Sequence, residues 1–380
     1  MHDADQQVSA IRWRKDALEL LDQRALPLAE RWVVCDSAGA VADAIGKMVV
    51  RGAPAIGIAA AYGLVLAAGR ALKDDTDTAT LTSALNEADR VLAASRPTAV
   101  NLFWALKRMR RRWEQALEGL GHHSGSENAL KTIEAEAVAI HSEDLANNRL
   151  MASHGADYIH RLAGDSSKAE LIITHCNTGS LATGGHGTAL GVVRTLHASG
   201  SVELVYVDET RPWMQGARLT SWELLREGVP SALIVDSAAA SMMARAVANG
   251  RKGWVIVGAD RVAANGDVVN KIGTYSLAVL ARYHGWKFMV VAPLSTFDPA
   301  VSSGADIEIE ARPGIEITSV GPTPYAPEGV EAINPVFDVT PASLVDVLVS
   351  ELGVIEAPDR ERVGRWTAGN QLIDRDYKTL

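Results

Sequence analysis

Cysteine is almost absent from this chain of 380 residues. The two cysteines, Cys35 and Cys176, lie far apart in the sequence. No CxxC pair and no Cys/His spacing of a zinc site occurs, so the sequence indicates neither a disulfide framework nor a zinc module. So few cysteines are typical of a protein of the reducing cytoplasm, and we expect a cytoplasmic protein without a metal.

Positive charge is in deficit, because 37 Lys and Arg face 46 Asp and Glu, a net charge of -9. This balance argues against a nucleic-acid partner. The polar N-terminus has neither a signal-peptide nor a transit-peptide pattern. One uncharged stretch, 52–69, approaches membrane-spanning length, but it is rich in Ala and Gly and is flanked by Arg51 and Arg70. We expect a buried helix there and no contact with a membrane.

The remaining composition, 47% hydrophobic and 22% charged residues, is that of a globular protein with a large core. From about residue 10 to 150 the apolar residues recur with helical spacing, which predicts a mainly helical domain over 1–150. The expected helices are 41–50, 56–71, 79–94, 98–119 and 134–162.

From about residue 170 short apolar runs alternate with helical patterns. The expected strands are 171–174, 204–207, 232–235, 255–257 and 288–291, with weaker edge strands at 307–310 and 315–318. Repeated βα units predict a doubly wound parallel sheet, so we expect an α/β domain over 151–380 that ends in a polar tail.

Two of these strands end in a reactive type of side chain, one in a thiol and the other in a carboxyl group. The first run continues into His-Cys-Asn-Thr-Gly, and the run at 254–257 continues into Gly-Ala-Asp-Arg. Ligands of open α/β sheets bind outside the carboxyl ends of the strands, so we expect Cys176 and Asp260 to face a ligand. A thiol in a polar turn is typical of a reactive cysteine, and a carboxyl group in a water-poor cleft can act as a general acid. The plainer interpretations are an inert cysteine and an Asp260–Arg261 ion pair.

Residues 185–191, Gly-His-Gly-Thr-Ala-Leu-Gly, imitate a dinucleotide-binding fingerprint, and Asp208 imitates its ribose-binding acid. The spacing argues against this interpretation, because a fingerprint glycine follows its strand at once and the strand here ends near Thr174. The loop is also compatible with an anion site. Asp208 is then either solvated, a ligand of sugar hydroxyls, or a partner that orients Arg211 and Arg218.

Three further segments offer cationic groups for an anion. Arg51 opens an apolar helix beside small residues that leave backbone amides accessible. Arg96 precedes a proline, which favours an extended backbone. Lys271 lies at a predicted helix start, where a cation is disfavoured unless an anion lies nearby.

Together, six motifs resemble those of the methylthioribose-1-phosphate isomerase family. They are RGAPAIG from Arg51, RPTAVNL from Arg96, THCNTGSLAT from Thr174, DETRPWMQGARLTSWEL from Asp208, GADRVAANGDVVNKIGTYSLAVLA from Gly258 and APLSTFD from Ala292. The resemblance runs from about residue 10 to 350. Regulatory subunits of the translation-initiation exchange factor and ribose-1,5-bisphosphate isomerase share this fold. The exchange-factor subunits do not as a group keep both the Cys and the Asp, so their joint presence favours an enzyme.

The resemblance implies an aldose–ketose isomerase that converts 5-methylthioribose 1-phosphate to 5-methylthioribulose 1-phosphate in methionine salvage, with no cofactor. It makes Asp260 the proton donor and Cys176 the residue that assists transfer between C1 and C2. It assigns substrate binding to Arg51, Gly52, Ala53, Arg96, Gln215, Asn270 and Lys271. It also implies a helical N-terminal domain, a Rossmann-like second domain and a homodimer. The chain departs from the family at His186, where an aromatic is common, and in the tail 357–380.

Three alternatives stay open at this point. An isomerase of 5-deoxyribose 1-phosphate or another pentose 1-phosphate is one, because apolar contacts to the C5 substituent discriminate by only ~1–3 kcal/mol per group. A non-catalytic regulatory protein that senses a sugar phosphate or nucleotide is the second. A nicotinamide-dependent oxidoreductase is the third.

Overall fold

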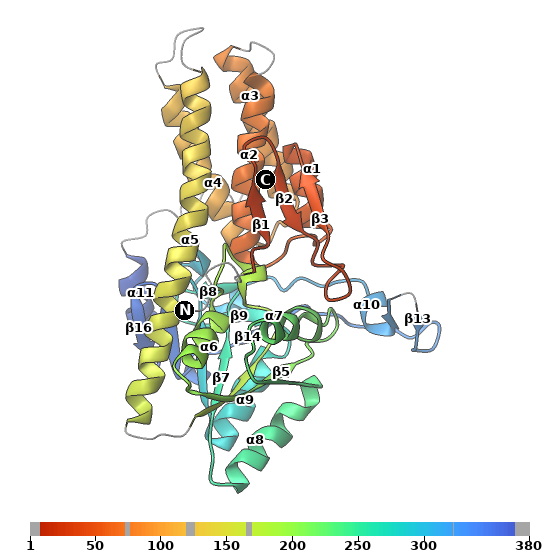
Figure 1. Ribbon diagram of the computed structural model, residues 1–380, viewed down its shortest axis with the longest axis vertical. Coiled ribbons are helices and arrows are strands. Elements are labelled where there is room, and N and C mark those ends of the chain that lie inside the picture. The colour runs from red at the N-terminus through yellow and green to blue at the C-terminus, as the bar shows by residue number, and fades with distance from the viewer. Residues whose placement is uncertain (1–7, 73–76, 119–125, 165–168, 322, 369–380) are drawn as a thin grey trace. The chain divides into compact units, whose positions relative to one another are not determined.

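The chain folds into two compact units in the computed structural model, which describes residues 8–72, 77–118, 126–164, 169–321 and 323–368 (Figure 1). The first unit contains the described residues up to Arg149 together with Gly179–Gly187. The second unit contains Leu150–Thr178 and the described residues from Thr188 onward. The division falls inside the long helix α5 (Ser126–Ala163).

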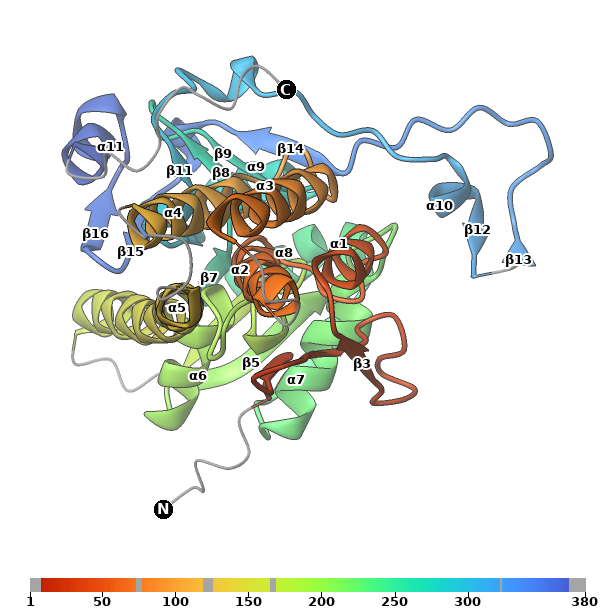
Figure 2. The ribbon, with the colours of Figure 1, turned by 90° about the horizontal axis from the view of Figure 1, so that it is seen from above.

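The first unit is built around helix α2 (Ala53–Leu72), which packs against its three neighbours (Figure 2). These are α1 (Ala38–Gly46), α3 (Thr78–Ala94) and α4 (Val100–Leu117). Among the described residues α2 is the one helix long and apolar enough to cross a membrane, and 72% of its most apolar window is buried inside the protein. Its apolar surface is therefore used in packing within the first unit.

Small residues let the neighbouring helices approach α2 closely. A Cβ placed on Gly57 would lie 2.7 Å from the carbonyl oxygen of Asn101 on α4. A Cβ on Gly63 would lie 3.1 Å from the Leu92 side chain on α3. Gly57 and Gly63 of this helix are thus explained by close contacts with the backbone of α4 and with a side chain of α3.

A three-stranded antiparallel sheet precedes these helices, and the sequence interpretation missed it. Its strands are β1 (Ile11–Trp13), β2 (Leu18–Leu21) and β3 (Trp32–Cys35), in that order. Each strand has only three or four residues, which is too short for a period of two to stand out against the helical pattern that follows.

The second unit contains a seven-stranded sheet in the order β16-β15-β10-β7-β4-β5-β6. Its strands are β4 (Glu170–Thr174), β5 (Val202–Asp208), β6 (Ser231–Ile234), β7 (Trp254–Val257), β10 (Lys287–Val291), β15 (Val347–Ser350) and β16 (Gly353–Glu356). Every neighbouring pair is parallel except β15 and β16. The five predicted strands from 171 to 291 are confirmed within one or two residues, and β15 and β16 were not predicted.

Helices cover both faces of this sheet, as expected for a doubly wound fold. Alternate residues of β4 illustrate this: Ile172 belongs to the core formed with α6 (Ala189–Ala198), and Ile173 belongs to the core on the opposite face. The opposite core contains α8 (Ala239–Ala248), α9 (Thr274–His284) and α11 (Arg360–Thr367). The predicted class, a helical region followed by a Rossmann-like parallel sheet, is confirmed.

A smaller sheet in the order β11-β8-β9-β14 completes the second unit. Its strands are β8 (Arg261–Ala263), β9 (Val268–Lys271), β11 (Phe297–Asp298) and β14 (Phe337–Thr340). The predicted edge strands at 307–310 and 315–318 are wrong. The first forms no strand, and the second is the helix α10 (Ile315–Thr318), which Figure 2 shows beside the short strands β12 (Ser319–Val320) and β13 (Thr323–Pro324).

We predict that Gly57→Ala destabilises the protein by about 1–3 kcal/mol, because the added methyl group meets a main-chain carbonyl that cannot move alone. Gly364→Ala in α11 is the matched control, since a Cβ there meets nothing within 4 Å. The control should stabilise by about 0.5–1 kcal/mol through helix propensity. Urea unfolding measures both, and a Gly57→Ala protein as stable as the wild type would contradict the packing argument.

Candidate active site

Cys176 lies just beyond the end of β4 with a left-handed backbone, φ +63°. A residue other than glycine in this region costs about 1–3 kcal/mol and persists only where its surroundings hold it. Its N–H donates to Thr210 Oγ1 at 2.9 Å, and its carbonyl accepts from Thr220 Oγ1 at 2.6 Å. The side chain is 8% exposed. The sequence places the thiol at the strand end, and the two threonines fix its turn.

Asp260 follows β7, the strand that pairs in parallel with β4. The Thr174 hydroxyl donates to the carbonyl of Ile256 on β7 at 2.9 Å. A Cβ on Gly258 would lie 2.7 Å from the Thr178 side chain, so the segments beyond the two strand ends touch. The structure therefore brings Cys176 and Asp260 to the carboxyl ends of adjacent parallel strands, where the topology of the sheet places ligands.

Asn270 and Lys271 end β9, which runs antiparallel to β8 directly after Asp260. The Asp260 N–H donates to the carbonyl of Val269 at 2.9 Å, so the backbone of Asp260 is bound to β9. Asn270 Nδ2 donates to Thr274 Oγ1 at 2.9 Å. The structure thus gathers Asp260, Asn270 and Lys271 in one part of the second unit.

Lys271 is a strand residue, which corrects its predicted place at a helix start. Helix α9 begins at Thr274 after Gly273, whose φ of +105° breaks the strand. The side chain of Lys271 is buried, donates to the carbonyl of Val336 at 2.8 Å, and lies 4.4 Å from the centroid of the Phe337 ring. The anion at the helix start is Asp338, which accepts from the Gly273 N–H at 2.8 Å. Burial raises the pKa of Asp338 and outweighs the lowering by this backbone hydrogen bond.

Gln215 ends the segment that follows β5 and precedes a π-helical turn, η3 (Gly216–Thr220). Single π-turns occur often at functional sites. A Cβ on Gly216 would lie 1.7 Å from the carbonyl oxygen of Asp208, so only glycine allows this segment to lie against β5. Gln215 is 6% exposed, and its Oε1 accepts no hydrogen bond from the described part of the chain. A ligand hydroxyl is a suitable donor for it.

A buried histidine that the sequence interpretation did not use lies directly before Cys176. The Nδ1 of His175 is 3.0 Å from Oδ2 of Asp208, and its Nε2 is 2.8 Å from the carbonyl oxygen of Ile272. Asp208 is 1% exposed, so it is not solvated, and its carboxylate pairs with a histidine. Two features of the sequence could have indicated this contact: His175 is adjacent to Cys176, and Asp208 lies at the end of a predicted strand.

One group of side chains in the described part of the chain has the composition of a metal site. It comprises His175, Asp208 and Asp236, whose ligand atoms lie within 4.8 Å of one another. Both nitrogens of His175 are already in hydrogen-bonding contact with protein oxygens. The two carboxylate oxygens of Asp236 each accept a backbone N–H at 2.7 Å, from Thr210 and Arg211. The group is therefore built as a hydrogen-bond network.

A second buried network supports the Cys176 turn from the other side. Asn177 Nδ2 donates to Glu223 Oε1 at 2.8 Å, and Arg194 donates to Glu223 and Glu227 at 2.7 Å each. Burial lowers the pKa of Arg194, but the two glutamates outweigh it and the net direction is upward. The Glu223 side chain has no exposed surface. Arg194 is thus the counter-charge for a fully buried carboxylate that holds Asn177.

The other predicted binding residues belong to the first unit. Arg51 is buried, and Gly52 and Ala53 follow it at the N-terminus of α2. Gly52 has φ +98°, and a Cβ on it would lie 2.6 Å from Ala182 in the short helix η2 (Ser180–Ala182). Arg96 is half-buried in the turn between α3 and α4. The N-terminus of α2 thus combines backbone amides with the adjacent cation of Arg51, which are the groups that an anion site needs.

The glycine-rich loop does not form a dinucleotide-binding turn. Gly185 lies eleven residues after the end of β4, whereas the fingerprint requires direct succession. Side chains of α5 use the loop's backbone groups: the Gly184 N–H donates to Asp144, and Asn148 donates to the Gly185 carbonyl at 3.0 Å. The fingerprint interpretation is therefore wrong on geometry.

His141 on α5 also holds this loop, since its Nε2 is 3.1 Å from the Gly184 carbonyl and its Nδ1 is 3.2 Å from the Tyr62 hydroxyl. Burial lowers the pKa of His141 and raises that of Tyr62 to about 12. A neutral imidazole that accepts from the tyrosine and donates to the carbonyl satisfies both contacts.

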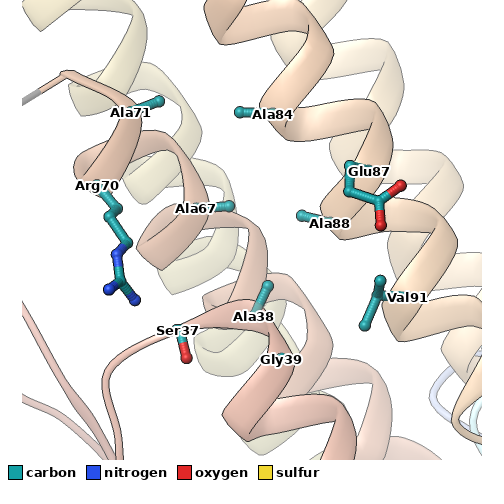
Figure 3. Close-up of a pocket in the computed structure, with 10 residues that line it drawn as sticks. All are labelled: Ser37, Ala38, Gly39, Ala67, Arg70, Ala71, Ala84, Glu87, Ala88 and Val91. Carbon is teal, nitrogen blue, oxygen red and sulfur yellow. The ribbon is translucent and has the colours of Figure 1, made fainter. Parts of the chain in front are cut away.

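An open groove lies between α1, α2 and α3 of the first unit (Figure 3). Six of its ten lining residues are alanine or glycine, and Arg70 and Glu87 are the charged ones. Glu87 already binds Arg90. None of the predicted site residues lines the groove, and its shape follows from small side chains on three helices.

Comparison with known proteins identifies one family, whose members carry two functional names. Residues 49–357 match the model of the initiation factor 2 subunit family. The chain is 55% identical to the methylthioribose-1-phosphate isomerase of Stutzerimonas stutzeri, over 95% of this chain and 96% of the relative. The solved 5-methylthioribose 1-phosphate isomerase of Pyrococcus horikoshii is 39% identical, with a TM-score of 0.84 over 95% of this chain and 96% of that one. The translation initiation factor eIF-2B subunit delta of A. fulgidus is 38% identical, with a TM-score of 0.79 over 94% and 99%.

We predict that Arg194→Ala destabilises the protein by about 3–5 kcal/mol, because it leaves the buried Glu223 carboxylate without its counter-charge. Arg365→Ala is the control, since Arg365 pairs with Glu361 on the surface and both side chains are more than two-thirds exposed. The control should change the free energy of unfolding by less than about 1 kcal/mol. Equal losses for the two variants in chemical unfolding would show that the buried network does not stabilise the fold.

Proposed function

This chain belongs to the initiation factor 2 subunit family, and from that premise we propose that it is a methylthioribose-1-phosphate isomerase. It converts 5-methylthioribose 1-phosphate to 5-methylthioribulose 1-phosphate, a step of methionine salvage. The observation that carries the proposal is the 53–55% identity to isomerases of that name over nearly the whole of both chains. The intact Cys176 and Asp260 motifs at adjacent strand ends support it.

The chemistry starts from a blocked anomeric carbon. C1 of the substrate carries the phosphate ester and the ring oxygen, so no free aldehyde is available and ring opening needs an acid. Asp260 donates its proton to the ring oxygen as the bond between C1 and the ring oxygen breaks. One hydrogen then moves from C2 to C1, and the C2 hydroxyl loses its proton as the ketone forms. That proton balances the one given by Asp260, and the phosphate stays on C1. Cys176 assists the C2-to-C1 transfer.

Seven residues bind the substrate in this proposal: Arg51, Gly52, Ala53, Arg96, Gln215, Asn270 and Lys271. Arginine forks and helix N-termini suit a phosphate, which supports the roles of Arg51 and the α2 terminus. The buried Oε1 of Gln215 suits a sugar hydroxyl. We propose that the reaction needs no cofactor or metal.

We propose a cytoplasmic homodimer that contacts neither nucleic acid nor a membrane. The net charge of -9 and the packing of α2 inside the first unit support the last two points. The scarcity of cysteine supports the reducing compartment. We propose a mainly helical domain over 1–150 and a Rossmann-like catalytic domain over 151–380 with a C-terminal tail, although Gly179–Gly187 group with the first unit.

A regulatory role without turnover is the second candidate, because the likeness to the A. fulgidus eIF-2B delta structure is nearly as high as that to the isomerase structure. The two functions differ in one observable. An isomerase consumes its ligand, whereas a sensor binds it and releases it unchanged.

We predict that Asp260→Asn and Cys176→Ala each lower kcat by about 10²–10⁴-fold, the usual contribution of a group that moves a proton. Arg51→Ala should instead act mainly on KM. A phosphorus and proton NMR time course with 5-methylthioribose 1-phosphate and no added cofactor measures all three.

Cys35→Ala is the matched control for the thiol, since Cys35 is buried in the first unit and burial raises its pKa to about 11. It should leave kcat unchanged. Binding without conversion by the wild type would favour the regulatory candidate, and equal loss of folding stability in the three site variants would remove their assigned roles.

Selectivity at C5 gives a further prediction. Apolar contacts to the methylthio group are worth ~1–3 kcal/mol per group, so we expect kcat/KM for the 5-deoxy and 5-hydroxy pentose 1-phosphates to fall by about 10–200-fold. Parallel initial-rate measurements on the three substrates decide it. A higher kcat/KM for the hydroxy sugar would reassign the substrate to another pentose 1-phosphate.

A further inference from the structure

The imidazole of His175 connects three segments of the second unit. It follows β4, contacts Asp208 at the end of β5 through Nδ1, and contacts the carbonyl of Ile272 in the turn before α9 through Nε2. His175 and Asp208 are each 1% exposed. No solvent competes for these bonds, so the two contacts set the spacing of the three segments.

The contacts also fix how many protons the pair holds. A carbonyl oxygen only accepts, so Nε2 carries a hydrogen and donates it to Ile272. The 3.0 Å contact between Nδ1 and the carboxylate of Asp208 requires a second hydrogen between them. The pair therefore holds two protons when both bonds are made.

The surrounding charges favour this doubly protonated pair. Burial lowers the pKa of His175, but Asp208 and Asp236 raise it and the net direction is upward. Burial raises the pKa of Asp208, and His175 lowers it. Glu209, next to Asp208 in the chain, also raises the pKa of Asp208. Asp338 on β14 interacts with both His175 and Lys271.

The fit around the ring is tight. A Cβ on Gly273 would lie 2.8 Å from Cε1 and 3.0 Å from Nε2 of His175, so the turn before α9 packs its backbone on the imidazole. Any shift of the ring therefore moves the turn that carries Ile272, the residue next to Lys271.

Asp208 reaches Cys176 by a second route. The Thr210 hydroxyl donates to the carbonyl of Asp208 at 3.0 Å. Oγ1 of the same hydroxyl accepts the Cys176 N–H. The side chain of Asp208 thus holds the residue before Cys176, and its backbone holds Cys176 through Thr210.

We propose that His175 and Asp208 form a buried positioning pair for the isomerisation, which holds the Cys176 turn and the Ile272–Gly273 turn, next to Lys271, in one geometry. The pair works only while it keeps both protons. This inference rests on the proposed function for its kinetic consequences, and on the hydrogen-bond geometry alone for its structural ones.

Substitutions can separate the bonds from the charge. Asp208→Asn keeps both contacts with a neutral ring, because the new amide nitrogen donates to Nδ1 while Nε2 still donates to Ile272. His175→Gln loses one of the two contacts, because its single amide nitrogen donates to either the Asp208 carboxylate or the Ile272 carbonyl and its oxygen then faces the other acceptor. In the double variant, which combines the two substitutions, the amide nitrogen introduced at position 208 can donate to the amide oxygen introduced at position 175, which restores the link. His154→Gln is the matched control, because His154 also contacts a main-chain carbonyl, that of Ser350 at 3.1 Å.

We expect His175→Gln to lower kcat about 100-fold, the effect of a misplacement near 1 Å, with a smaller change in KM. The double variant should recover at least tenfold of that loss, and Asp208→Asn should stay within about tenfold of wild type at pH 7. His154→Gln should match the wild type. Unfolding midpoints measured alongside identify a variant that fails to fold, and Asp208→Asn then tests the pair alone. A kcat unaffected by His175→Gln, or a double variant no better than the single one, would overturn the proposal.

The pH profile gives a readout that a merely structural role would not move. The wild type should lose kcat as the pH rises through the raised pKa of His175, because the ring loses its Nδ1 proton and faces a bare carboxylate. Asp208→Asn should lack that alkaline limb, since its pair is already neutral and bonded. Identical alkaline limbs in the two proteins would contradict the proton count.

Alkylation of Cys176 by iodoacetamide in a Cys35→Ser background tests the pair without any substrate. His175→Gln should change the alkylation rate at least tenfold, and the double variant should return it toward the wild-type value. This result together with a wild type that converts no pentose 1-phosphate would reject the proposed function and keep the pair. Unchanged alkylation in an active enzyme would reject the pair and keep the function.

Discussion

The left-handed backbone of Cys176 is the constraint on which the rest of this site depends. A cysteine adopts that conformation only if its neighbours offset the strain, and here its N–H and carbonyl are each bound by a threonine hydroxyl. Thr210 belongs to the segment after β5, and Thr220 is the last residue of the π-helical turn η3. The conformation of one residue thus depends on two segments that are distant in the sequence.

Close backbone approach is the second requirement, and glycine meets it at the ends of the central strands. Gly216 lies against the carbonyl of Asp208, Gly258 against Thr178, and Gly273 against the ring of His175. A methyl group at any of these positions would push a loop away from the strand ends. The strands supply a rigid edge, and the glycines let the polar turns pack upon it without a gap.

Much of this arrangement could be predicted from the order of residue types. The βα alternation after residue 170 identified five strands of the parallel sheet, and the topology of such sheets placed Cys176 and Asp260 at one edge. The small sheet of β8, β9, β11 and β14 could not be predicted in the same way, because its short strands contain polar residues and lack the continuous apolar runs that marked the parallel strands. The place of Lys271 was mistaken for the same reason.

The sequence by itself determined the fold class, the family and the pair of residues that carry the proposed chemistry, because these depend on local periodicity and on contiguous motifs. Only the tertiary structure decided what holds the Cys176 turn. His175 and Asp208 are 33 residues apart, and Asn177 and Glu223 are 46 apart. No local pattern joins such partners. Burial then decides their importance, since a polar group removed from water must find its hydrogen bond within the fold.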